Sequence, residues 1–285
     1  MNASIPRTFA IAAVAALAVH SAGAQSTGDR AKVLRAAADA LGMPRYADIG
    51  SGATRLPPID VVNTMEFHGN GTSYSADRTF TTEFHVSLGY NPAAMRMEMT
   101  RTAPGGGAAQ HSIQTVRENA AWDESEIGAG LVPGKGTATP VMNAVKERLL
   151  LLWTLPYGVV KAALAAGEKT TVSTEGAATV MTFPLSGQLA GITVRATLDS
   201  KNFVTKVETR PDNPALANLA TETEYSDYAD RGEVLTDIKS PGHIVRRQGG
   251  RPVLDIRVKM WEANNLYLVF PVPQNVKTAA AASSR

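Results

Sequence analysis

The sequence predicts an α+β protein built on one large, curved antiparallel β-sheet, a half-barrel, with an N-terminal helix and a helical hairpin packed on its concave face. Three observations predict it. Several segments alternate apolar and polar residues with period two, as strands with one wet and one buried face do. Turn residues separate these segments at short intervals. One long apolar stretch with helical spacing interrupts them, and helices set apart from an antiparallel sheet are typical of the α+β class.

Length and composition allow a large core. The chain has 285 residues, of which 44% are hydrophobic and 19% charged, values typical of a folded domain. Lys and Arg number 28 against 26 Asp and Glu, which argues against a nucleic-acid-binding protein because phosphate binding requires a basic excess. The sequence has no cysteine, and this excludes disulfides, thiolate metal sites and a cysteine nucleophile.

Residues 1–24 are predicted to be a signal peptide. Arg7 supplies the positive n-region, Thr8–Val19 is a short apolar run, and Ala22-Gly23-Ala24 fits the small-x-small rule for cleavage before Gln25. The run is too short to span a bilayer comfortably, and an uncleaved anchor is the alternative. The mature chain is therefore expected to be periplasmic or secreted, with no membrane span.

The first element of the mature chain is a predicted helix over Asp29–Leu41. Apolar residues recur along it at helical spacing from Val33 onward, and Gly42 stands where a C-terminal stop is expected.

Strands are predicted for most of the remaining sequence. Turn signals stand at Gly69-Asn70-Gly71, Pro104–Gly107, Asp199–Asn202, Asp230–Gly232 and Gly249-Gly250. The strand candidates are 59–67, 79–89, 94–102, 110–118, 170–175, 178–184, 191–199, 203–210, 220–228, 234–240, 243–248 and 252–262. This up-and-down order favours one broad, curved sheet or a partly closed barrel.

A helical hairpin of about 25 residues is predicted between Val141 and Gly167. Val145, Leu149 and Leu152 share one face of its first helix, and Pro156 suits the first turn of the second. We expect the hairpin to pack on the concave face of the sheet. Residues 25–263 then form a single domain, followed by a C-terminal tail over 264–285 whose Ala- and Ser-rich end, 278–285, is predicted to be disordered.

No metal site, cofactor or catalytic residue is predicted. The histidines outside the signal peptide show none of the H-x-H, H-x-x-H or H-E-x-x-H spacings. A hairpin centred between residues 73 and 74 places His68 opposite residue 79 rather than His85, and a turn at Pro104–Gly107 places His111 opposite Arg101. The fourth, His243, lies far along the chain.

Other catalytic patterns are equally weak. The sequence has no G-x-S-x-G elbow, and Gly105-Gly106-Gly107 lacks the lysine of a phosphate-binding loop, so a hairpin tip is favoured. Glu222 and Glu224 lie about 7 Å apart on one face of a strand, as paired catalytic carboxylates do. A solvated sheet face explains them as well, and an enzyme using this pair stays a third alternative.

The feature that most favours a binding site is apolar. Met95, Met97 and Met99 line one face of a strand, and methionine is common in adaptable apolar sites because its side chain is flexible. The hairpin residues expected across that face are Leu149, Trp153, Leu155 and Tyr157. These seven residues are the candidate site for a lipophilic small molecule; the alternative is that they form the core.

Several stretches carry a family resemblance, in order and over nearly all of residues 30–263. They are Tyr90–Glu98, Leu152–Gly158 with Lys161–Ala163, Lys206–Thr209 with Asp212–Pro214, Glu222–Tyr228 and Gln248–Asp255. In them the chain resembles the N-terminal region that precedes the hydrolase domain of exported bacterial metallo-β-lactamase-fold proteins. Tyr157 departs from the histidine of that family at this position.

The resemblance does not extend to the catalytic domain. In the family, a hydrolase domain with an H-x-H-x-D-H zinc motif follows, and the metal activates water. This sequence has no such motif. It ends at Arg285, shortly after Phe270-Pro271-Val272-Pro273, about where that domain would begin. The resemblance implies no hydrolase activity for this chain, and its architecture is similar in outline to the half-barrel lipoprotein carriers of the periplasm.

Two functions are therefore expected. The first is an exported non-catalytic domain that binds an apolar ligand or a partner protein. The alternative is an accessory fragment of a metallo-β-lactamase-fold zinc hydrolase, with that metallo-hydrolase domain as its partner.

Overall fold

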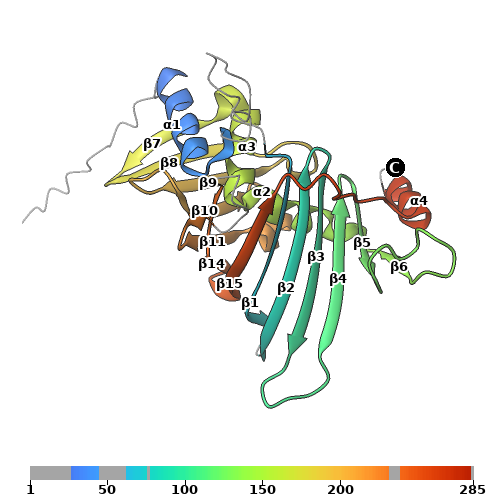
Figure 1. Cartoon of the computed structure of the whole chain (residues 1–285). Helices are drawn as coiled ribbons and strands as arrows, with labels where there is room; N and C mark the ends of the chain where they lie inside the picture. Colours follow the sequence, from blue (N-terminus) through green and yellow to red (C-terminus); the bar gives the residue numbers. More distant parts are fainter. Residues whose placement is uncertain (1–26, 45–61, 76–77, 231–237, 284–285) are drawn as a thin grey trace, which may run out of the picture.

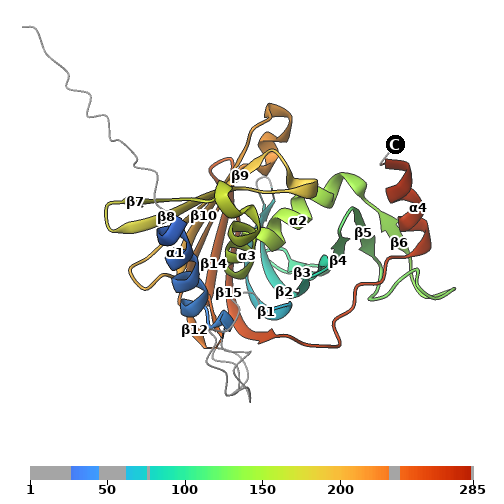
Figure 2. The ribbon, with the colours of Figure 1, turned by 90° about the horizontal axis from the view of Figure 1, so that it is seen from above.

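One antiparallel sheet of 13 strands runs through the computed structural model, which describes residues 27–44, 62–75, 78–230 and 238–283. The strands stand in the order β6-β5-β4-β3-β2-β1-β15-β14-β11-β10-β9-β8-β7, so most strands pair with their neighbour in sequence (Figure 1). A separate pair joins β12 (Ala229–Asp230) to β13 (Lys239–Ser240). Seen from above, the large sheet curves around two central helices (Figure 2). The predicted α+β class is confirmed.

The strands follow the predicted pattern closely. Their bounds are β1 Thr64–Ser75, β2 Arg78–Tyr90, β3 Ala93–Thr102, β4 Gln110–Arg117, β5 Ala120–Glu124, β6 Ala138–Pro140, β7 Thr171–Glu175, β8 Ala178–Pro184, β9 Ile192–Leu198, β10 Val204–Pro211, β11 Thr221–Ser226, β14 His243–Gln248 and β15 Arg251–Ala263. In β9 every second residue from Ile192 to Leu198 is buried, which is the alternation that predicted it. The short strands β5 and β6 are not among the predicted ones.

Three helices fill and flank the concave side. α1 (Thr27–Ala40) contacts α3 and β7. It ends two residues before Gly42, which has a left-handed backbone conformation (φ 73°). α2 (Val145–Thr154) packs against β3 and β4, and α3 (Pro156–Ala166) against β8. Pro156 occupies the first turn of α3, where its missing N–H costs nothing. The predicted first helix and helical hairpin are confirmed, and Figure 2 shows the hairpin inside the curve of the sheet.

Within the described residues, no single helix is long and apolar enough to cross a membrane. Met142–Thr154 and Pro156–Lys169 reach that length and apolar composition only when taken together, and they are bent by 98°. Most of their side chains are buried, as those of core helices are.

The predicted turn at Gly69-Asn70-Gly71 is wrong, because β1 continues through it. Ser75 pairs with Arg78, so the hairpin lies later in the chain. The glycines serve a close approach instead: a Cβ at Gly69 would lie 2.0 Å from the carbonyl oxygen of Arg257, and one at Gly71 would lie 2.1 Å from that of Asp255. Both carbonyls belong to β15, which pairs with β1 through a bulge at His68/Gly69.

Replacing Gly71 by alanine is expected to lower the free energy of unfolding by about 1–3 kcal/mol, because the new methyl group forces β1 and β15 apart. Gly89→Ala on β2 is the matched control, since its Cβ would meet no atom closer than 3.5 Å. Urea unfolding of the two variants measures the difference. Equal stabilities would show that β15 does not lie against Gly71.

The predicted disorder of residues 278–285 is wrong over its described part. α4 (Gln274–Ser283) is a helix whose Val276 and Ala280 pack on Trp122 of β5, and the Asn275 side-chain amide donates to the Ala138 carbonyl of β6 at 2.7 Å. Alanine has the highest helix propensity, so an Ala-rich segment with an apolar surface beside it folds. The predicted signal peptide 1–24 and the strand ends at 59–61 and 234–237 lie outside the described residues.

A buried carboxylate fixes the end of the sheet beneath α4. Glu124, 6% exposed, accepts hydrogen bonds from the Trp122 indole (2.9 Å), the Thr115 hydroxyl (2.9 Å) and the Gly128 backbone N–H (2.7 Å). The Arg96 guanidinium lies 3.4 Å away. In the acidic run Trp122-Asp123-Glu124-Ser125-Glu126, Glu124 is thus a buried structural carboxylate, whereas Glu126 is exposed.

Candidate functional site

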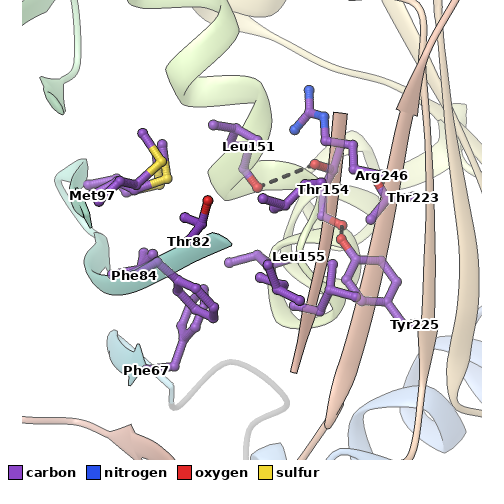
Figure 3. A pocket seen from close by; sticks show the side chains of 16 residues that line it. Phe67, Thr82, Phe84, Met97, Leu151, Thr154, Leu155, Thr223, Tyr225 and Arg246 are labelled. Atoms are coloured by element: carbon purple, nitrogen blue, oxygen red, sulfur yellow. Dashed lines mark hydrogen bonds between the residues drawn. The ribbon is translucent and has the colours of Figure 1, made fainter. Parts of the chain in front are cut away.

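A cavity of about 70 Å³ lies between the concave face of the sheet and the hairpin (Figure 3). Strands β1–β3 form one wall, α2 and the turn after it a second, and β11, β14 and β15 a third. The lining residues in that order are Phe67, Thr82, Phe84, Val86, Met95, Met97, Met99; Leu151, Thr154, Leu155; and Thr223, Tyr225, Ile244, Arg246, Leu254, Ile256. The lining is therefore mostly apolar and drawn from segments far apart in sequence.

The three methionines lie on the cavity wall together. Met95 and Met99 are 2% and 4% exposed, whereas Met97 between them is only half-buried. On the neighbouring strand Met97 stands opposite Val86. The structure thus brings Met95, Met97 and Met99 to one surface, as the period-two alternation predicted.

Only one of the four predicted hairpin residues reaches this cavity. Leu155 lines it, together with Leu151 and Thr154, while Leu149 and Trp153 line other pockets on another side of α2. Placing Leu149 and Trp153 across the methionines was therefore wrong. Residues 149–152 are four leucines in a row, so the helix is apolar on every side there and the sequence does not indicate which side faces the methionines.

Tyr157 is a core residue rather than a cavity residue. It is fully buried, its hydroxyl donates to the Lys239 carbonyl at 2.8 Å and lies 2.9 Å from the Ser240 hydroxyl, and its ring lies 6.1 Å from that of Trp261. Burial raises the pKa of Tyr157 well above its ordinary value, so it stays neutral. Its role is to fix the start of α3 against β13.

Sequence reasoning missed the polar side chains of the third wall. Thr223 on β11 and Arg246 on β14 are directly opposite each other, and both are labelled in Figure 3. Arg246 is 8% exposed and Thr223 3%. A signal was present: in the strand His243–Gln248, alternation from the apolar Ile244 puts Arg246 on the inner face and Arg247 on the outer.

Burial dominates the electrostatics of this wall. It lowers the pKa of Arg246, and the charges of Tyr225 and Glu147 oppose that shift. Burial also raises the pKa of Tyr225, and the positive charge of Arg246 partly opposes that rise. The Tyr225 hydroxyl donates to the Thr154 carbonyl at 2.7 Å, so this phenol ties β11 to the end of α2.

The pairing predicted for His68 is wrong. His68 stands directly opposite His85, with ring centroids 6.3 Å apart, because the β1–β2 turn lies later in the chain than predicted. His111 stands opposite Thr100, one residue from the predicted position. His85 is 2.6 Å from a carboxylate oxygen of Glu66. In the part of the chain that the structure describes, no group of three or more His, Asp or Glu side chains is arranged to hold a metal ion.

The paired carboxylates belong to an ion-pair lattice on the outer face of the sheet. Glu222 lies 2.7 Å from Lys206 and 3.4 Å from Arg247, and Glu224 lies 3.0 Å from the same arginine. Such half-exposed pairs contribute little stability individually. Their arrangement is that of a solvated strand face.

No protein-family model and no curated protein matches the sequence. A solved structure of a DUF1329 family protein from Desulfovibrio piger ATCC 29098 resembles this chain with a TM-score of 0.44 and 8% sequence identity, over 83% of this chain and 95% of that one. At such an identity the likeness concerns the fold alone. The resemblance to the N-terminal region of metallo-β-lactamase-fold hydrolases stays a prediction.

Proposed function

We propose that this chain is an exported, non-catalytic domain that binds an apolar ligand in the concave cavity. The observation that carries the proposal is the cavity itself, whose apolar walls include the flexible Met95, Met97 and Met99. Apolar cavities stay dry and accept apolar guests. Each square ångström of ligand surface removed from water contributes about 25 cal/mol.

The size of the cavity indicates how a ligand would enter. At about 70 Å³ it is too small for a long chain as it stands. Methionine has three rotatable side-chain bonds and adapts its shape readily, and Met97 is half-exposed. A larger ligand therefore enters by displacing the methionine side chains rather than by moving the sheet.

Native mass spectrometry of the mature protein, recovered from a bacterial periplasm after expression of residues 1–285, tests the proposal directly. A mass excess of a few hundred daltons that disappears on denaturation supports a bound apolar ligand. A bare monomer mass, with no binding of added alkyl ligands, contradicts it. The N-terminal residue of the recovered protein tests export, and we expect Gln25.

Replacing Met97 by glutamate is expected to abolish ligand binding while the fold is retained. The new carboxylate would need to be buried against the ligand, at a cost of several kcal/mol, whereas in the free protein it reaches water from a half-buried position. Met97→Leu should keep binding, and Met260→Glu controls for the added charge because Met260 is 45% exposed on β15. Circular dichroism and ligand titration measure the two properties; unfolding of Met97→Glu would assign Met97 to the core instead.

A second candidate is an accessory role beside a metallo-β-lactamase-fold zinc hydrolase. It is favoured by the segment that follows β15, where Leu266, Tyr267 and Val269 are 91%, 90% and 67% exposed, since exposed apolar groups of this kind mark interaction surfaces. The segment precedes Phe270-Pro271-Val272-Pro273, after which the resemblance would place the start of a hydrolase domain. A reading frame with an H-x-H-x-D-H motif directly downstream in the genome supports this role, and unrelated DNA there counts against it.

A further inference from the structure

A buried cation faces the apolar cavity without a partner. Arg246 lines the cavity and is 8% exposed, and none of the described residues forms a hydrogen bond or ion pair with its guanidinium. Buried charges are normally paired because the loss of hydration is expensive. Among the described residues, the Arg246 guanidinium therefore lacks an anionic partner.

The other buried arginine of the described chain shows what a satisfied guanidinium looks like here. Arg148 donates to the carbonyl oxygens of Thr115 (3.0 Å) and Trp122 (2.7 Å) and to the Asp123 carboxylate (2.6 Å). On the strand of Arg246 itself, the next residue, Arg247, faces outward and is paired with two glutamates. Of the two arginines that are buried in the described chain, Arg148 has its acceptors and Arg246, which lines the cavity, has none.

A second polar group points to the same place. The Thr223 hydroxyl is buried and has no partner within hydrogen-bond geometry, although it lies near enough to Tyr225 to help lower the pKa of that phenol; Thr223 is the cross-strand partner of Arg246. The Tyr225 hydroxyl is already used by the Thr154 carbonyl. One wall of the cavity therefore offers a guanidinium and a hydroxyl, while the opposite wall offers methionine sulfurs and methyl groups (Figure 3).

No carboxylate among the described residues forms an ion pair with Arg246. Glu147, one helical turn before Leu151 on α2, is the carboxylate whose charge acts on Arg246. Its side chain is exposed and forms no ion pair with Arg246. The described residues place no carboxylate at the guanidinium, and the anionic group of a ligand would fill that place.

We infer that Arg246 and Thr223 form the head-group end of the cavity, and that the ligand is an amphiphile with one anionic head group, a carboxylate or a phosphate ester, on an apolar chain. The chain extends from Arg246 toward Met95, Met97 and Met99. The head group accepts charge-assisted hydrogen bonds from the guanidinium and one from Thr223. This inference rests on the proposed apolar binding and adds to it the charge and position of the head group.

The experiment compares ligands of one chain length with different heads. Octanoate, octyl phosphate, octan-1-ol and inorganic phosphate are titrated into residues 25–285 labelled with ¹³C at the methionine methyl groups, and the signals of Met95, Met97 and Met99 report binding. We expect both anionic amphiphiles to bind at least about tenfold more tightly than octan-1-ol, as charged hydrogen bonds in a buried site do. The tighter of the two identifies the head group.

Variants locate the head group. Arg246→Gln should remove the preference for the anionic ligands over octan-1-ol, and Arg246→Lys should restore part of that preference. Arg247→Gln, the neighbouring arginine on the outer face, should leave the preference unchanged.

The outcomes separate the two proposals. Equal binding of octanoate and octan-1-ol, unaffected by Arg246→Gln, would overturn the head-group assignment and leave apolar binding intact. Binding of inorganic phosphate as tightly as octyl phosphate would identify a plain anion site and overturn the amphiphile. The absence of any methionine shift with every alkyl ligand would overturn the apolar site as well. The wild-type comparison does not depend on the folding of a variant.

Discussion

Replacing Glu124 by alanine is expected to lower the free energy of unfolding by about 3–5 kcal/mol, the cost of removing one partner from a buried charge pair. The substitution leaves the Trp122 indole, the Thr115 hydroxyl and the Gly128 N–H without their acceptor. It also leaves the Arg96 guanidinium, which lies 3.4 Å from this carboxylate, without its countercharge. Urea unfolding followed by tryptophan fluorescence measures the loss.

Glu126→Ala is the control for this substitution. Glu126 is in the same acidic run but is exposed, and exposed substitutions usually change stability by less than about 0.5 kcal/mol. Glu124→Gln should fall between the two, because an amide still accepts hydrogen bonds while the charge is lost. Similar stabilities for Glu124→Ala and Glu126→Ala would show that the Glu124 network does not form.

Replacing Arg246 by methionine is expected to stabilise the ligand-free protein, by about 1–4 kcal/mol on the precedent of buried charges exchanged for apolar residues of similar size. The physical reason is that the buried guanidinium loses hydration and gains only the distant attraction of Glu147 in return, whereas methionine matches the apolar walls. For a chain of this size each kcal/mol raises the melting temperature by about 2–4 °C. Calorimetry on delipidated protein measures the change.

The same exchange at the other buried arginine, Arg148→Met, is expected to have the opposite effect on stability. Arg148 is equally buried but has three acceptors, so its loss should destabilise the protein by about 3–5 kcal/mol. A destabilised Arg246→Met protein would mean that Arg246 supports the fold rather than a ligand. If Arg246→Met stabilises the protein and Arg148→Met destabilises it, Arg246 serves a function at the expense of stability.

The strands were predictable because each is half-buried. In β9 the residues that face the core and the residues that face solvent alternate strictly, and period two is a local property of the sequence. The hairpin was predictable for a similar reason, since Pro156 and Gly167 mark the start and end of an apolar segment. Local patterns of this kind need no knowledge of neighbouring elements.

Features that depend on distant neighbours were not predictable. Gly69 and Gly71 have the composition of a turn, and only the approach of β15 shows that they belong to a strand. The side of α2 that faces the methionines is undetermined in a run of four leucines, and the fold selected Leu151. The tail has the composition of a disordered segment, and Trp122 at the end of the sheet is what orders it as α4.

The pairing of β1 with β15 has a consequence for how the protein folds. β1 to β6 form one half of the sheet from successive hairpins, and the strands from β7 to β15 form the other, so each half assembles through contacts that are mostly local in sequence. The seam between the halves joins opposite ends of the described chain and closes after the last strand is available. The cavity has Phe67 on one side of that seam and Leu254 and Ile256 on the other, so a bound molecule contacts both halves. A ligand that binds more tightly should therefore also slow the separation of β1 from β15.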